Sequence, residues 1–227
     1  MAVTTSAGTA GGRTGARAPE ERRRRILEAT VAVIRDRGFA GTRVTDIAGA
    51  AGTSSGLVVY HFGSLAGALT QCLTHVEDLF YGELETELES VAGPVERLRR
   101  MAELASESGP AVGDWTLWLE LWVRALRDDD ARAARESLDR RWRAALRAVV
   151  VEGVTAGVFH PADVAATTLR LSSLMDGLAI QLALAEPGMT AARFRRLWLD
   201  SAALELGVPT QAFRCRAARS PRRRTAS

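Results

Sequence analysis

The side chains best suited to chemistry in this sequence are hydrogen-bond donors near its start. Arg22–Arg25 form a run of four arginines, and Arg43 and His61 follow. Arginine and histidine donate to phosphate oxygens, whereas Ser55 and Tyr60 can also reach the edges of bases. This set of residue types indicates contact with a nucleic acid.

The sequence lacks the usual signatures of an enzyme. His61, His75 and His160 have no metal-binding spacing with Cys72 or Cys215. There is no phosphate-binding loop and no nucleophile elbow. We therefore expect no catalytic residues, no metal and no cofactor. A small helical enzyme stays an alternative, but it would need a site that the sequence does not reveal.

Two short helices joined by a tight turn would position the donors. Gly52 can end the first helix, because glycine reaches the left-handed conformation needed there. Ser54 can cap the second helix, about residues 55–62, which carries Val58 and Phe62 on one face. A helix, a glycine turn and a second helix form the unit that places its second helix in the major groove of DNA.

This stretch resembles the DNA-binding domain of the TetR family of bacterial transcription regulators. It matches the family pattern at Ile47, Ala48, Ala51, Gly52, Ser54, Gly56, His61, Phe62 and Ser64. The chain departs from the family pattern at two positions whose family residues typically contact phosphate. Val59 stands where the family has tyrosine, although Tyr60 follows directly, and Leu65 stands where the family has lysine. The resemblance implies an all-α fold, a DNA operator as partner, and DNA contacts from Arg22, Arg24, Arg25, Thr42, Arg43, Thr45, Ser54, Ser55, Gly56, Leu57, Val59, Tyr60 and His61.

Composition and charge agree with a DNA-binding protein. Residues 1–43 carry nine arginines against four acids, and residues 44–206 carry fifteen arginines against twenty-three acids. A basic end beside an acidic body suits a protein that offers one end to phosphates. No apolar run is long enough to span a membrane, and the start lacks the apolar core of a signal peptide. With two cysteines far apart, we expect a reduced, cytoplasmic setting and no membrane partner.

The chain is expected to divide into four parts. Residues 1–18 are predicted to be a disordered arm, and 19–82 a DNA-binding domain with its helix-turn-helix at about 44–63. Residues 83–208 are predicted to be a helical ligand-binding and dimerisation domain, and 209–227 a basic, disordered tail. We expect Pro19 to open the first helix and Gly38 to end it, with Thr42 or Thr45 capping the next.

Further helix starts are expected at Pro94, around Asp128–Asp130, at Pro161–Asp163 and at Thr190. The C-terminal half also resembles the ligand-binding domain of the choline-responsive branch of the TetR family. The likeness is carried by DWTLWLELWVRALRDD, RWRAALRAVVVEGV and LSSLMDGLAIQLAL.

Three tryptophans on one face of the helix near 115–125 are candidates for an effector pocket. Aromatic faces bind cations, and Asp176 could add charge, so a quaternary ammonium or a polyamine could bind. An apolar metabolite or drug is an equal alternative, and such a stripe of tryptophans also suits a helix core. Asp176 could instead form a hydrogen bond across a helix interface. The candidate pocket residues are Met101, Leu104, Trp115, Trp118, Trp122, Trp142, Met175 and Asp176.

The last two helices combine small and large residues in a way that suits a four-helix interface between two copies of the chain. We expect this homodimer interface to contain Ser172, Ser173, Gly177, Ala179, Ala183, Phe194, Leu197, Trp198 and Ser201. The alternative is that the Trp198 face packs only within its own chain.

The sequence thus predicts a ligand-responsive transcription regulator, a repressor that a small-molecule effector releases from a palindromic operator. The rival interpretation is a helical ligand-binding or interaction protein that has lost specific DNA binding, motivated by Val59 and Leu65.

Overall fold

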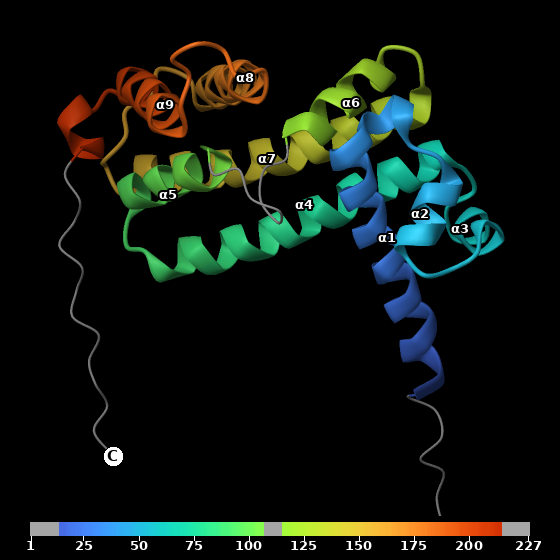
Figure 1. Ribbon diagram of the computed structural model, residues 1–227. Helices are drawn as coiled ribbons and strands as arrows, with labels where there is room; N and C mark the ends of the chain where they lie inside the picture. The colour runs from blue at the N-terminus through green and yellow to red at the C-terminus, as the bar shows by residue number, and fades with distance from the viewer. Residues whose placement is uncertain (1–13, 107–114, 215–227) are drawn as a thin grey trace, which may run out of the picture. The chain divides into compact units, whose positions relative to one another are not determined.

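The protein is all-α over the residues that the computed structural model describes, 14–106 and 115–214. No strand occurs in these ranges, so the predicted fold class is confirmed. The helices, labelled in Figure 1, are α1 (Thr14–Gly41), α2 (Val44–Ala50), α3 (Ser55–Phe62), α4 (Leu65–Ser90), α5 (Pro94–Ser106), α6 (Trp115–Ala125), α7 (Asp129–Thr155), α8 (Val164–Ala183), α9 (Ala191–Leu206) and the 3-10 helix η1 (Thr210–Phe213).

The chain forms two compact units, Met1–His75 and Val76–Ser227. The division falls inside α4 rather than after residue 82, where the sequence suggested it. Because α4 continues through the division as one helix, the two units are joined without a loop.

The first helix begins earlier than expected. It starts at Thr14 and includes Pro19, so residues 14–18 of the predicted disordered arm are helical, and residues 1–13 lie outside the described range. Ala16, Arg17 and Ala18 favour helix, and extending an existing helix costs much less than starting one. Gly38, with φ 69° and ψ 165°, interrupts the helix where the sequence predicted its end.

The first unit buries the apolar faces that the sequence predicted. Ile26 and Leu27 of α1 are buried, as are Ile47 of α2 and Phe62 of α3. Ala68, Leu69, Cys72 and Leu73 of α4 are buried as well. The burial of Phe62 among these residues therefore turns one face of α3 inward.

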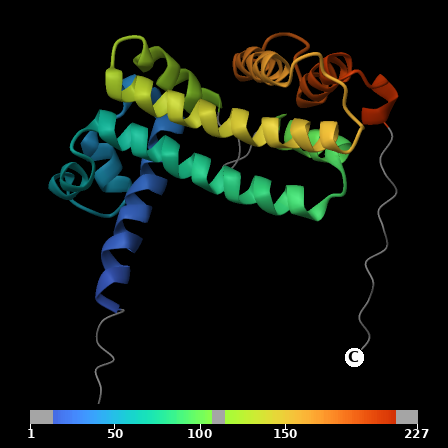
Figure 2. The ribbon, with the colours of Figure 1, turned by 180° about the vertical axis from the view of Figure 1, so that it is seen from behind.

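In the second unit α7 lies between two layers (Figures 1 and 2). The part of α4 from Val76 on runs along one side of it, and α8 and α9 lie on the other. The core of this unit joins α4, α5, α7, α8 and α9, and its largest fully buried side chains include Trp198, Phe159 and Phe194.

Caps fix the helix ends in this unit where the sequence placed them. Asp128 caps α7 by accepting from the amide of Ala131, and Thr190 caps α9 by accepting from that of Arg193. The tail departs from expectation, because Thr210–Phe213 form a 3-10 helix. Phe213 is buried in the core, which orders the start of the segment predicted to be disordered; residues 215–227 lie outside the described range.

Within the described residues no single helix has the length and hydropathy needed to cross a membrane. Only α3 and α4 counted together, across a bend of 67°, reach that threshold.

Candidate functional site

The turn between α2 and α3 fixes the direction of α3. Gly52 has a left-handed φ of 62°, and the amide of Thr53 donates to the carbonyl of Ala48 at 2.9 Å, which closes the end of α2. Ser54 then caps α3, since its hydroxyl accepts from the amide of Leu57 at 3.2 Å. This is the geometry of a helix-turn-helix unit.

One face of α3 is buried and the other is open. Val58 and Phe62 are buried, whereas Tyr60 is 81% exposed and Gly56 and Val59 are also exposed. Other predicted contact residues of this helix are partly exposed, namely Ser55, Leu57 and His61. The exposed surface is mainly apolar, and Tyr60 is the most exposed of its polar residues.

Arg43 begins α2 as its N-cap residue, where the sequence suggested Thr42 or Thr45. Its amide donates to Asp46 Oδ2 at 2.9 Å, and Arg37 Nη1 donates to Asp46 Oδ1 at 3.0 Å. The prediction of a threonine cap was wrong because Asp46, in the third position of the helix, supplies the carboxylate. The side chains of Arg43 and Thr45 are exposed.

Thr42 is only 4% exposed, and its hydroxyl donates to the carbonyl of Gly38 at 2.7 Å. Because the hydroxyl is both buried and used, the position argues against a DNA contact from this side chain, and Thr42 is set aside from the contact set.

The four arginines Arg22–Arg25 of α1 differ in whether their side chains already have partners. Arg22 and Arg25 are exposed and have no hydrogen-bond or ion-pair partner among the described residues. Arg24 bridges Glu21 and Glu28, and the hydrogen bond with Glu21 raises its pKa above the ordinary value. Arg22 and Arg25 are therefore better placed to meet phosphate.

Arg23, which belongs to the predicted basic run but not to the predicted set of contact residues, helps to position α3. Its guanidinium donates to Gln71 Oε1 at 2.6 Å and lies 5.9 Å from the centre of the Phe62 ring. It precedes the buried pair Ile26 and Leu27 by three and four residues. That spacing puts it on the inner face of the helix and could have identified it.

Most of the predicted pocket residues belong to the core of the second unit. Met101, Leu104 and Met175 are fully buried there, and Trp115 and Trp142 pack against it. The indole of Trp115 donates to the carbonyl of Ala105 at 3.1 Å, and that of Trp118 donates to Glu77 at 2.9 Å. None of these six lines either groove described next.

Trp122 and Asp176, in contrast, come together in one groove. This groove of about 470 Å³ lies among α6, α7 and α8, which pack against one another. Its lining is Trp122, Ala125, Leu126, Arg132, Arg135, Asp139, Asp176 and Ile180. Burial, then the nearby charge of Asp139, raises the pKa of Asp176 to about 7.

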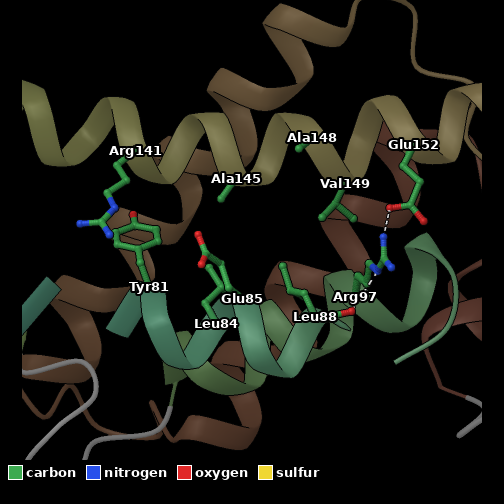
Figure 3. A pocket seen from close by; sticks show the side chains of 10 residues that line it. All are labelled: Tyr81, Leu84, Glu85, Leu88, Arg97, Arg141, Ala145, Ala148, Val149 and Glu152. Atoms are coloured by element: carbon green, nitrogen blue, oxygen red, sulfur yellow. Dashed lines mark hydrogen bonds and ion pairs between the residues drawn. The ribbon is translucent and has the colours of Figure 1, made fainter. Parts of the chain in front are cut away.

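A second groove of about 370 Å³ lies between α4 and α7 (Figure 3). Its floor is apolar, and an ion pair closes the end at Arg97 and Glu152. At the other end Arg141 pairs with Asp78 at 2.6 Å and stacks over the Tyr81 ring at 4.2 Å. Its remaining lining residues are Leu84, Glu85, Leu88, Ala145, Ala148 and Val149.

The predicted dimer residues fall into buried and accessible groups. Phe194, Trp198 and Ala179 are fully buried, Ser172 is nearly so, and the Trp198 indole donates to the carbonyl of Leu171 at 2.9 Å. These four are corrected to intramolecular positions, because α8 and α9 pack on each other. Accessible or partly accessible are Ser173, Gly177, Ala183, Leu197 and Ser201.

Fold and site together define a helix-turn-helix protein with a helical C-terminal unit. The sequence profile described as "Bacterial regulatory proteins, tetR family" matches residues 26–67, and that described as "BetI-type transcriptional repressor, C-terminal" matches residues 94–207. The chain belongs to the TetR family of bacterial transcription regulators, in its BetI-type branch.

Individual relatives agree with this membership. The HTH-type transcriptional regulator BetI of Paraburkholderia xenovorans is 28% identical over 182 residues, covering 78% of this chain and 89% of that protein. The BetI of Paraburkholderia phymatum is 28% identical over 127 residues, and the chain spans 63% of its length.

Solved structures are also similar. A transcriptional regulator from Saccharomonospora viridis in complex with choline has 31% identity and a TM-score of 0.73, covering 80% of this chain and 95% of that one. A TetR-family regulator from Rhodococcus sp. has 26% identity and a TM-score of 0.72, covering 82% of this chain and 99% of that one.

Proposed function

We propose that this regulator binds a palindromic operator as a homodimer, with α3 of each subunit in the major groove, and that a small-molecule effector releases it. The observation that carries the proposal is the orientation of α3. Burial of Val58 and Phe62 leaves Tyr60, 81% exposed, on the opposite face of a capped helix. A side chain of this size, held away from its own core, suits contact with a partner.

The open face of α3 would make both polar and apolar contacts with DNA. Tyr60 and Ser55 hydrogen-bond to bases or phosphates, and Val59 and Leu57 meet apolar groups such as thymine methyls. Gly56 lets the backbone approach closely. Because this face has few polar groups, phosphate contacts from Arg22, Arg25, Arg43 and His61 supply much of the affinity. Arg24 contributes a phosphate contact only when its ion pairs with Glu21 and Glu28 break.

Dimerisation would use the outward faces of α8 and α9. Leu169, Ser173 and Gly177 follow one another along one exposed face of α8, and Leu197 and Leu204 are exposed on α9. Exposed leucines beside small residues suit close packing against the same two helices of a second copy. Two subunits then present two recognition helices to half-sites about one helical turn, roughly 34 Å, apart.

Release would follow from a shift between two arrangements of the dimer. Effector bound in the C-terminal unit favours the arrangement whose recognition helices no longer match the half-sites. The covalent continuity of α4, which runs from one unit into the other, gives the motion a route. Choline, found in the Saccharomonospora viridis regulator, is the first effector to try.

Operator binding by single variants tests this proposal. Tyr60→Ala and Arg43→Ala should each weaken binding to the palindromic DNA upstream of the regulator's own gene, by about 1–3 kcal/mol for a residue that reads bases and less for one that contacts phosphate. Arg140→Ala is the matched control, since Arg140 is exposed on α7 in the other unit. All variants should keep the helical circular dichroism of the wild type.

Full retention of binding by both variants would remove α3 from the interface. Binding that shows no preference for the upstream DNA over a scrambled duplex would favour the rival, a ligand-binding protein without specific DNA recognition.

A further inference from the structure

One guanidinium group in the first unit contacts two other helices. Arg23 of α1 donates from Nη2 to Oε1 of Gln71 on α4 at 2.6 Å, and its guanidinium carbon lies 5.9 Å from the centre of the Phe62 ring on α3. Elsewhere in this unit α1 packs on α2, and α2 packs on α3. The side chain of Arg23 therefore adds a direct link from α1 to α3 and α4.

Both partners of Arg23 are uncharged. Its neighbour Arg24 pairs with two carboxylates, whereas no carboxylate pairs with Arg23 in the part of the chain that the structure describes. An amide oxygen and the face of an aromatic ring hold a guanidinium by its direction and planarity, without neutralising its charge. Arg23 is also half-buried, while Arg22 and Arg25 are exposed. This geometry suits a side chain that holds helices in place rather than one that meets phosphate.

Phe62 sets the direction of the exposed face of α3. It is the last residue of α3, it is buried, and Tyr60 on the opposite face is 81% exposed. The chain has little freedom beyond Phe62, because a Cβ added at Gly67 of α4 would lie only 2.1 Å from the Phe62 carbonyl oxygen. A group that holds the Phe62 ring therefore also fixes where Tyr60 points.

Arg23 restrains the start of α1 in the same way. Arg22 directly precedes it and Arg25 follows two residues later, so the hydrogen bond to Gln71 holds the segment from which the exposed arginines project. The two sets of proposed DNA contacts, on α1 and on α3, are thus joined through one side chain. Their spacing matters, because phosphate contacts fix the register in which bases are read.

We propose that Arg23 is a positioning residue that sets operator specificity. It holds the arginines of α1 and the exposed face of α3 in register through Gln71 and Phe62, and it does not contact DNA itself. The inference rests on the proposed function, since it requires that α3 reads the operator. The basic run then has two tasks: Arg22 and Arg25 bind phosphate, and Arg23 maintains the geometry.

Affinities of the full chain for the upstream palindrome and for a scrambled duplex test the proposal. Arg23→Lys keeps the charge but loses the planar guanidinium that reaches both Gln71 and Phe62. It should lower the ratio of specific to non-specific affinity by about fivefold or more, the effect of one lost hydrogen bond, and leave non-specific affinity unchanged. Arg22→Lys, the same substitution at the exposed neighbouring position, is the matched control and should leave the ratio unchanged.

Substitutions of Gln71 separate position from charge. Gln71→Leu removes the acceptor without changing any charge, and it should lower the ratio as Arg23→Lys does. Combining the two should lower the ratio little further, because both break the same link. Gln71→Glu keeps an acceptor for the guanidinium and should retain a ratio near that of the wild type, although its added negative charge lowers both affinities alike.

The salt dependence of binding distinguishes a positioning residue from a phosphate contact. Arg23→Met should leave the slope of log affinity against log salt close to that of the wild type, whereas Arg22→Ala should reduce it by about one. A reduction of about one by Arg23→Met would place Arg23 on phosphate and overturn the proposal.

Two further results would also overturn it. One is a wild-type ratio in either Arg23→Lys or Gln71→Leu. The other is an equal loss of both affinities in these variants, because partial unfolding lowers specific and non-specific binding together. A wild-type protein without preference for the palindrome would refute the proposed function itself and leave no specificity for Arg23 to set. A wild-type preference that survives Arg23→Lys refutes this inference alone.

Discussion

Two glycines of the DNA-binding unit differ in what they are needed for. A Cβ added at Gly67 would overlap the carbonyl oxygen of Phe62, so this position requires glycine for α4 to approach the end of α3. A Cβ added at Gly56 would meet nothing closer than Ser54 Oγ at 4.0 Å. Folding therefore does not require glycine at position 56, and the proposed close approach of this backbone to DNA can be tested there without disturbing the core.

We therefore predict opposite results for two substitutions. Gly67→Ala should destabilise the protein by about 1–3 kcal/mol in urea unfolding, because the backbone must shift to relieve the overlap. Gly56→Ala should leave stability unchanged or raise it by about 0.5–1 kcal/mol, as alanine does in a helix, while weakening operator binding. Operator binding unaffected by Gly56→Ala would show that the backbone there does not approach DNA.

Single side chains show where sequence reasoning stopped. The exposure of Tyr60 followed from its place on α3, because helical period alone separates it from Val58 and Phe62. The burial of Thr42 and the place of Asp176 in a groove did not follow, since each depends on groups far from it in sequence or in an irregular turn. Asp46 likewise displaced the predicted threonine caps by offering a carboxylate three residues into α2.

At the scale of helices, a partly buried hydrogen bond joins α4 and α6. Glu77 of α4 is only 7% exposed and accepts from the indole of Trp118 of α6 at 2.9 Å. Burial raises the pKa of Glu77 to about 7 from an ordinary 4.5, against the opposing effects of Trp118 and Arg141. Asp78 and Asp139 also face it and raise the value further.

This arrangement predicts how stability changes with pH. Because the pKa of Glu77 is higher in the folded state, its contribution is complete below about pH 4.5 and is lost as the pH rises through about 7. Glu77→Gln removes that loss, so its stability relative to the wild type should rise by about 3 kcal/mol between pH 4.5 and pH 8. Urea unfolding across this range measures it, with Glu83→Gln, an exposed position on the same helix, as control. A pH-independent difference between Glu77→Gln and wild type would contradict the assignment.

Helix positions were largely predictable from sequence, whereas helix partners were not. Asp128, Asp163 and Thr190 cap their helices as expected, because capping depends on residues within one turn. The tryptophan stripe of α6 was recognised, but its period cannot separate a core position from a groove position. Packing with neighbouring helices determines which kind of position each tryptophan takes. The indoles of Trp115 and Trp118 donate to Ala105 and Glu77 within the unit, whereas Trp122 lines a groove.

For the whole molecule, the outward faces of α8 and α9 predict the oligomeric state. Leu204 is 81% exposed on α9, so Leu204→Asp should place a charge inside the proposed dimer interface and lower the mass measured by sedimentation toward that of a monomer. Leu79→Asp is the matched control, because Leu79 is 52% exposed on α4. A Leu204→Asp protein that stays dimeric at low micromolar concentration would move the interface elsewhere.

The proposed binding of a specific operator relies on an unusually apolar α3, supported by arginines. It is tested most directly by measuring affinity for the upstream palindrome and for a scrambled duplex of equal length at two salt concentrations, about 50 and 200 mM. Specific binding should exceed non-specific binding by at least about a thousandfold. Both affinities should fall steeply with salt, because phosphate contacts release counterions. Equal affinity for the two duplexes at both salt concentrations would contradict the account.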